Sequence, residues 1–309
     1  MFGLVPRTVW SRAVETDDRD RITVQHNCLL LERADEPTAV AGSANAASLA
    51  SPRLVLIETG TGDKLDAKSK DIFDLEDRSI LDALHEADCR PEDIEAVFVS
   101  HLHFDHAGGL TRLPRPGEAP DWIGPGSAGS HGVKRSFPNA RVYVQARERF
   151  DAINNTSVMT RTYFRDHLDP VLEQMVSLES PPPFSPGLIP LREEMPTSPV
   201  MLRRTQAVEG VHVFLAPGHT WGQQAVMFED DRGRPIVFTP DVMPTVNHVG
   251  AAYSLGYDVE PYTSMMTKRW FLDAAAQYGW LLVLDHEPGN PCVRVTRNGR
   301  GWFDLAPEE

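Results

Sequence analysis

The chain has 309 residues, of which 41% are hydrophobic and 24% charged, and its formal net charge is −14. This composition is typical of a globular protein, and the length suits one large α/β domain. The acidic balance, with no dense lysine and arginine cluster, argues against a nucleic-acid partner or an anionic membrane surface. No apolar run approaches the roughly 18 residues of a membrane span, and the start lacks the pattern of a secretory signal.

The first half of the chain alternates strand-like and helical segments. Runs rich in apolar residues predict strands at 21–32, 53–60 and 95–100, and the segment 140–148 begins as a strand. Segment 79–89 has apolar residues at helical spacing and is predicted to be a helix. This alternation favours an α/β fold.

The second half continues the alternation. The pattern predicts strands at 210–218, 223–230 and 234–241, a helix at 263–280, and a last core strand in 281–289 that ends in a loop. No short-period repeat and no linker divides the chain, so we expect a single domain spanning residues 1–309.

Two stretches are too rich in glycine and proline to be regular elements. We predict long loops at about 114–137, with the richest part at 114–132, and at 180–199. Both exceed ordinary connector lengths, which makes them candidates for lids or substrate-contacting loops. The alternative for each is a plain surface excursion.

The hexapeptide HLHFDH places three histidines and one carboxylate directly after the apolar run 95–100. Imidazole nitrogen and carboxylate oxygen suit zinc, and also iron and manganese. A turn here can direct His101 and His103 to one metal ion while Asp105 and His106 face a second ion beside it. Taken alone, such a cluster is moderately specific, and the alternative is a chance occurrence on a surface loop or an adventitious metal trap.

Three further metal-competent side chains, His219, Asp241 and His286, each follow an apolar strand. Any one of the histidines could be a core residue satisfied by hydrogen bonds. The carboxyl ends of strands, however, are where α/β architectures place their chemistry. All three in that context, with HLHFDH upstream, predict one composite metal site.

Together these motifs resemble the metallo-β-lactamase-fold hydrolase superfamily, through HLHFDHAGG and then APGHT, TPD and DHEP in that order. The resemblance covers about residues 21–290 and implies an αββα sandwich, with two mixed β-sheets and the helices outside. It also implies two metal ions bridged by Asp241. The implied ligands of the first ion are His101, His103 and His219, and those of the second are Asp105, His106 and His286.

Within that superfamily, the sequence is most similar to the N-acyl homoserine lactonase and methyl parathion hydrolase branch. FGLVPRTVW, HLHFDHAGG and the stretch from Asp241 to DHEP carry this similarity. Three positions depart from the branch. Glu58 stands where an aspartate is usual, Pro240 replaces the glycine before the bridging aspartate, and Pro244 replaces a tyrosine that polarises the lactone.

The missing phenol at position 244 counts against a standard quorum-quenching lactonase. His248, Tyr253 and Tyr257 follow shortly afterwards and are candidates to reach the pocket, with packing or surface positions as the alternative.

The cysteine content and the start of the chain bear on compartment and assembly. Cys28, Cys89 and Cys292 are few, odd in number and far apart, which predicts idle thiols in a reducing cytoplasm. Relatives usually have a strand ahead of the FGLVPRTVW segment. Either the true start lies upstream of Met1, or a sheet edge is exposed that a partner subunit could cover in a homodimer.

The implied cofactors are two divalent metal ions, zinc first, with manganese, cobalt or iron as alternatives. Two such ions lower the pKa of a bridging water, so we expect a metal-bridging hydroxide to attack a small-molecule ester, lactone or phosphotriester. Asp105 and Asp241 are the predicted catalytic residues, because they hold the metals and can accept the proton. No G-x-S-x-G elbow suggests a serine nucleophile.

Three other functions stay open at this point. A mononuclear iron persulfide dioxygenase shares the fold but uses fewer protein ligands. A glyoxalase-II-like thioesterase carries a helical C-terminal extension, whereas this chain ends soon after DHEP. A non-catalytic binding protein would be expected to have lost some of the seven ligands.

Overall fold

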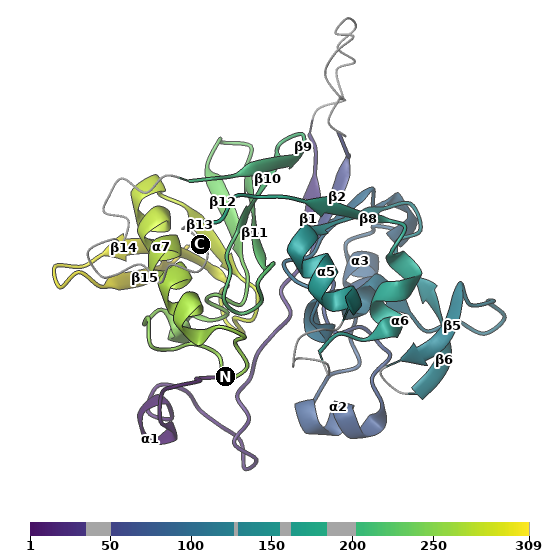
Figure 1. Cartoon of the computed structure of the whole chain (residues 1–309), viewed down its shortest axis with the longest axis horizontal. Helices are drawn as coiled ribbons and strands as arrows, with labels where there is room; N and C mark the ends of the chain where they lie inside the picture. Colours follow the sequence, from purple (N-terminus) through teal and green to yellow (C-terminus); the bar gives the residue numbers. More distant parts are fainter. Residues whose placement is uncertain (35–50, 127–128, 155–161, 184–201, 309) are drawn as a thin grey trace, which may run out of the picture.

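The computed structural model describes residues 1–34, 51–126, 129–154, 162–183 and 202–308. Two mixed β-sheets pack face to face, with helices on their outer sides (Figure 1). The predicted αββα sandwich is therefore confirmed.

The first sheet has the strand order β1-β2-β3-β7-β8. Its strands are β1 (Leu29–Glu32), β2 (Leu54–Ile57), β3 (Ala96–Phe98), β7 (Arg141–Gln145) and β8 (Met175–Leu178). Strand β1 pairs antiparallel with β2, and the remaining neighbours are parallel. Helix α3 (Ile80–Glu86) covers the outer face through Ile80 and Leu84. Its first turn is fixed by the Asp82 carboxylate, which accepts a 2.7 Å hydrogen bond from the Ser79 N–H.

The second sheet has the order β15-β14-β13-β12-β11-β10-β9. Its strands are β9 (Thr205–Val208), β10 (Val211–Leu215), β11 (Gln224–Glu229), β12 (Pro235–Thr239), β13 (Leu281–Leu284), β14 (Cys292–Arg297) and β15 (Phe303–Pro307). Only the pair β12 and β13 is parallel, because helix α7 (Pro261–Tyr278) makes the crossover between them. Proline at the first helical position and Gly279 with a φ of 64° at the end define the limits of α7.

The core between the sheets is built from alternate residues of facing strands. Val55, Ile57 and Phe98 of the first sheet pack against Val213 and Phe238 of the second, all of them buried. Burying each of the two phenylalanines contributes about 1.5–3 kcal/mol. This apolar contact holds the two sheets together, so that the ends of their strands meet at one edge.

Shorter elements complete the fold. The helices are α1 (Arg7–Trp10), α2 (Ala67–Phe73), α4 (Phe104–Ala107), α5 (Ala146–Asn154) and α6 (Arg165–Leu168), and the short strand β4 is Thr111–Arg112. Turns of 3₁₀-helix lie at Pro91–Asp93, Gly108–Leu110, Asp169–Val171 and Val246–His248. Among the described residues, no helix combines the length and the apolar character needed to cross a bilayer.

Two expectations from the sequence need correction. The strand expected at 21–32 is a strand only from Leu29 to Glu32. Its earlier part instead hydrogen-bonds to the loop after β13, where the Asn27 N–H donates to the Asp285 carbonyl at 2.7 Å. The region expected as a loop at 114–132 contains β5 (Trp122–Gly126) and β6 (Gly129–Arg135), which pair antiparallel.

Strand β6 also pairs with β4, so the glycine-rich composition accompanies a small three-stranded sheet. Glycine content alone does not reveal this pairing, because the strands are stabilised by hydrogen bonds to one another. Most of the second predicted loop, 180–199, lies outside the described residues.

Candidate metal centre

The predicted ligands converge at the edge where strands of both sheets end. HLHFDH follows β3, and His103 lies directly before the first turn of α4. His219, Asp241 and His286 lie in the loops that follow β10, β12 and β13. The sandwich therefore brings together residues that are up to 185 positions apart in the sequence.

The first cluster contains three histidines from two different loops. The His103 Nδ1 lies 3.1 Å from the His101 Nε2 and 3.0 Å from the His219 Nε2. All three side chains are buried. We call these residues the three-histidine group. Imidazole nitrogens this close together, with no room for separate hydration, suit a shared cation.

The second cluster contains His106, Asp241, Asp285 and His286, each offering one ligand atom within 4.8 Å of the others. We call these residues the carboxylate group. Asp241 lies between the two clusters. Its Oδ2 is 3.1 Å from the His219 Nε2, and its Oδ1 is 3.2 Å from the His286 Nε2. This position is consistent with a carboxylate shared by two metal ions.

Asp105 stands on the open side of the carboxylate group. Its Oδ2 lies 3.9 Å from the His106 Nε2 and 3.8 Å from the His286 Nε2. Its side chain is 26% exposed, whereas those of His106 and Asp241 are 2% exposed. The centre is therefore exposed to solvent at Asp105.

Two carboxylates of the centre were missed by the sequence analysis. The buried Asp285 Oδ2 lies 3.9 Å from the His286 Nε2. Its signal was present in the sequence, because Asp285 directly precedes His286 in DHEP. Asp258 accepts a hydrogen bond at 2.9 Å from the Nδ1 of His219. No sequence signal marked Asp258, because it lies 39 residues from its partner.

A layer of hydrogen bonds orients the histidine rings. The Nδ1 of His286 donates to the Gln25 carbonyl at 2.7 Å, and the Nδ1 of His101 lies 3.0 Å from the Ser100 hydroxyl. Together with the Asp258 contact to His219, these bonds turn the Nε2 atoms toward the centre. Such partners fix the tautomer and the ring direction of a metal ligand.

Glu58, the departure from the family's aspartate, reaches the centre with its longer side chain. The Glu58 Oε1 accepts a 2.6 Å hydrogen bond from the Ser100 N–H, and its Oε2 lies 3.4 Å from the His106 Nδ1. The residue has a positive φ of 67°. This uncommon backbone conformation directs the carboxylate toward the HLHFDH turn.

The glycine pair that ends HLHFDHAGG has a steric reason. A Cβ atom at Gly108 would lie 2.0 Å from the Thr61 carbonyl oxygen, and one at Gly109 would lie 2.1 Å from that of Thr59. The loop after β2 therefore packs directly on the backbone after His106. Only residues without a side chain allow this approach.

The prolines near Asp241 fit into the loop after β12. The Pro240 carbonyl accepts a hydrogen bond from Met243 at 3.0 Å, and the Pro244 carbonyl accepts one from the His286 N–H at 3.1 Å. Neither bond needs the N–H that proline lacks. Pro244 thus supports a predicted ligand through its backbone.

Of the three candidates to reach the pocket, Tyr257 packs against a predicted ligand. Its ring lies edge-on at 5.5 Å from the ring of His219. The rings of His248 and Tyr253 instead pack on Phe2, at 4.6 Å and 5.9 Å. Burial, followed by Asp241 and Asp105, raises the pKa of Tyr257 well above its ordinary value, so the phenol keeps its proton.

The electrostatics differ between the two clusters. Burial raises the pKa of Asp241, but His219 and His286 outweigh this effect and hold it well below the ordinary value. Burial lowers the pKa of His106, but Asp105 and Glu58 raise it to about 9. The carboxylate group therefore attracts positive charge. Metal ions bind such a group by displacing protons.

The three-histidine group is mixed. Burial, reinforced by the neighbouring imidazoles, lowers the pKa of both His101 and His103, and that of His103 falls to about 3. Burial also lowers the pKa of His219, but Asp241 and Asp258 outweigh this effect and raise it above the ordinary value. Neutral imidazole is the form that ligates metal. The donor set thus fits two divalent cations. In addition, the buried His106 Nε2 and both carboxylate oxygens of Asp285 have no hydrogen-bond partner among the described residues.

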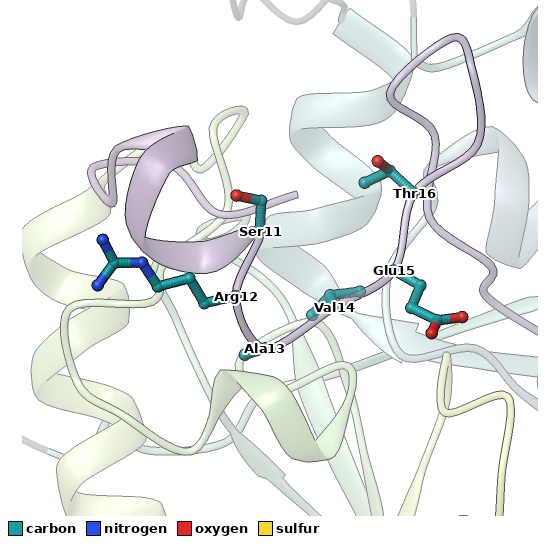
Figure 2. Close-up of a pocket in the computed structure, with 6 residues that line it drawn as sticks. All are labelled: Ser11, Arg12, Ala13, Val14, Glu15 and Thr16. Atoms are coloured by element: carbon teal, nitrogen blue, oxygen red, sulfur yellow. The ribbon is translucent and has the colours of Figure 1, made fainter.

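The N-terminal arm forms a separate hollow. Residues Ser11, Arg12, Ala13, Val14, Glu15 and Thr16 line it, next to α1 (Figure 2). None of them is a predicted ligand.

The family model described as the metallo-beta-lactamase superfamily matches residues 53–278. The chain belongs to this superfamily. Comparison with curated protein sequences gives no match.

A probable metal-dependent hydrolase from Staphylococcus aureus superposes with a TM-score of 0.71 at 21% identity, covering 100% of this chain and 91% of that one. The dizinc quorum-quenching lactonase AidC, in complex with a product, gives a TM-score of 0.57 at 18% identity, covering 83% of this chain and 76% of that one. The hydrolase AbOPH gives 0.57 at 17% identity, with the same coverages of 83% and 76%. At these identities, the likeness establishes the fold.

Proposed function

We propose that this protein is a dinuclear-metal-dependent hydrolase that cleaves an ester, a lactone or a phosphotriester. The observation that carries the proposal is the position of Asp241, with one oxygen beside the three-histidine group and the other beside His286. A single carboxylate between two cation-binding clusters favours two adjacent ions over one. The lactonase and hydrolase among the similar structures support the same class of reaction.

The proposed ligands are those implied by the resemblance. His101, His103 and His219 would hold one ion, and Asp105, His106 and His286 the other, with Asp241 shared. Zinc is the first choice, because imidazole and carboxylate ligands at a buried site suit it. Asp285 lies in the carboxylate group and could serve as a further oxygen ligand. Two such ions would lower the pKa of a shared water and so supply the nucleophile for hydrolysis.

The residues of the chain contribute orientation and proton transfer. Asp105 lies on the open side, where its partly exposed carboxylate can accept a proton from the attacking water. Tyr257 keeps its phenolic proton beside His219. Its hydroxyl donates to the Met1 Sδ at 2.9 Å and would exchange that partner to donate a hydrogen bond to a substrate oxygen on that side. The acidic balance of the chain, with a formal net charge of −14, favours an uncharged substrate over a nucleotide or another polyanion.

The experiment that tests this function starts with metal content. Protein purified without added metal is analysed by elemental mass spectrometry, and the same preparation is assayed on lactones, aryl esters and phosphotriesters. About two zinc, manganese or cobalt ions per chain together with turnover of one substrate class would support the proposal. One iron per chain with persulfide-dependent oxygen consumption would refute it in favour of the dioxygenase.

A further inference from the structure

Glu148 of α5 is a buried carboxylate that receives three hydrogen bonds from three separate segments. Its Oε1 accepts from the Leu102 N–H at 2.9 Å and from the Tyr163 hydroxyl at 3.1 Å. Its Oε2 accepts from the Thr220 hydroxyl at 2.6 Å. The residue is 0% exposed. A side chain that joins three segments in the interior fixes their relative positions.

The segments that Glu148 joins are those that carry the three-histidine group. Leu102 lies between His101 and His103, and Thr220 directly follows His219. The third donor, Tyr163, has its ring 5.2 Å from the ring of His103. Glu148 therefore contacts the backbone or the neighbours of every histidine in this group, while it contacts none of the three rings directly.

The contact between α5 and the His219 loop is also sterically close. A Cβ atom at Gly222 would lie 2.2 Å from the Glu148 backbone nitrogen. The loop that carries His219 thus rests on the backbone of α5 at the residue whose side chain binds Thr220. This packing leaves Glu148 little freedom to move, so it is a rigid support for the loop.

The charge of Glu148 has no conventional partner. Among the described residues, no lysine or arginine forms an ion pair with it, and the adjacent Arg147 pairs with Asp151 instead, at 2.8 Å. Burying a carboxylate without a cation is costly. The three-histidine group, in turn, has only neutral ligands of its own, with Asp241 shared. Asp258 lies behind His219, and Glu148 would add a second negative charge behind the group to offset the charge of a bound divalent ion.

We propose that Glu148 is a positioning residue for the metal ion of the three-histidine group, and that the carboxylate group does not depend on it. This inference rests on the proposed dinuclear function. It assigns to α5 a part in metal binding, although α5 carries none of the seven proposed ligands. The mechanism is indirect, because Glu148 acts through Leu102, Thr220 and Tyr163. Losing a partner of this kind typically weakens metal affinity 10- to 100-fold.

The test compares metal binding by the full-length chain with Glu148→Gln, which keeps the shape and removes the charge. Thr220→Val removes only one of the three donors. Asp273→Asn is the matched control, because Asp273 is also a buried carboxylate but pairs with Arg269 and Arg297 on α7 and β14. Each protein is titrated with cobalt and followed by its visible absorption, and zinc is counted after dialysis at fixed free zinc.

We expect wild type and Asp273→Asn to hold two ions. We expect Glu148→Gln to bind one of the two 10- to 100-fold more weakly, leaving a one-cobalt spectrum equal to that of His103→Ala. Thr220→Val should weaken the same ion to a smaller degree, and it keeps the test valid where Glu148→Gln does not fold.

Three results would overturn the inference. Unchanged affinity for both ions in Glu148→Gln and Thr220→Val would refute the role of Glu148 and leave the dinuclear function intact. Equal weakening of both ions would show that Glu148 has only a general structural role. A wild-type chain that never holds two ions would refute the proposed function, and this inference with it.

Discussion

Asp241 is the side chain that lies next to both clusters of the centre. Its two oxygens lie 3.1 Å from the His219 Nε2 and 3.2 Å from the His286 Nε2. With 4% of its surface exposed, it is also removed from bulk solvent. Its negative charge can therefore stabilise a cation bound in either cluster.

Replacing Asp241 with alanine is expected to abolish hydrolysis, with a loss of more than about 100-fold, because the two proposed ions would lose their shared ligand. Circular dichroism should show that the fold is largely preserved. His103→Ala is expected to behave similarly. Asp231→Ala, at an exposed turn, is the control and should retain activity. Full turnover by metal-depleted Asp241→Ala protein would refute the role of this residue.

Lys268 is a buried cation in α7 that supports the loop carrying Tyr257 and Asp258. Its Nζ donates to the Tyr253 carbonyl at 2.7 Å, and the residue is 1% exposed. Burial lowers the pKa of Lys268 from 10.5 to about 7. Between these values the unfolded chain binds more protons at this residue than the folded chain does. The free energy of unfolding therefore rises with pH across this window.

Lys268→Met is expected to remove this pH dependence. Relative to the variant, wild type should gain stability from pH 7 to pH 10, at a slope of at most about 1.4 kcal/mol per pH unit. Urea denaturation of both proteins at several pH values measures the difference, in which other titrating groups cancel. Parallel stability profiles for the two proteins would contradict the prediction.

At the scale of elements, the junction between the β2 loop and the turn after α4 is the closest backbone contact at the centre. Gly108 and Gly109 pack on Thr61 and Thr59, and the Thr59 hydroxyl donates to the His106 carbonyl at 2.6 Å. The two loops thus hold Glu58 and His106 in register. A side chain at either glycine would separate them.

Gly108→Ala is expected to destabilise the protein by about 1–3 kcal/mol, because the added methyl group would overlap with the Thr61 carbonyl. It should also weaken metal binding, since His106 moves with the turn. Gly299→Ala is the matched control, because a Cβ there meets nothing within 4 Å and should change stability by less than about 0.5 kcal/mol. Chemical denaturation checks both. Equal stabilities for Gly108→Ala and wild type would show that the two loops accommodate the added methyl group, and would contradict the prediction.

At the scale of the whole molecule, the centre joins the two sheets. His101, His103 and His106 follow β3 of the first sheet, whereas His219, Asp241 and His286 follow strands of the second. Ions bound between these loops would connect both halves at their shared edge. Metal binding should therefore stabilise the whole fold and not only the loops.

Removing the metal is expected to lower the melting temperature by several degrees, because an ion present at about 1,000 times its Kd contributes about 4 kcal/mol. Differential scanning calorimetry with and without a chelator measures this shift. Asp241→Ala should melt at one temperature in both conditions. A wild-type melting temperature that is the same with and without chelator would contradict a metal link between the sheets.

The sequence by itself determined the fold class and the residues that meet at the centre. Strand-forming runs that end in HLHFDH, APGHT, TPD and DHEP require an α/β arrangement in which those ends converge, and the structure brings the seven residues together. Short-range patterns suffice here, because each ligand immediately follows its own strand and the spacing within HLHFDH is local. The same pattern could have predicted Asp285 as well, because it directly precedes His286 in DHEP.

Only the tertiary structure decided which other side chains support the centre. Asp258 and Glu148 reach His219 and its loop from 39 and 72 residues away, and Gln25 reaches His286 from 261 residues away. The pairing of β5 with β6, in a region rich in glycine and proline, could not be predicted from the sequence either. In each case the partners meet because the packing of two sheets brings distant segments together, and no periodicity or spacing in the chain encodes such a contact.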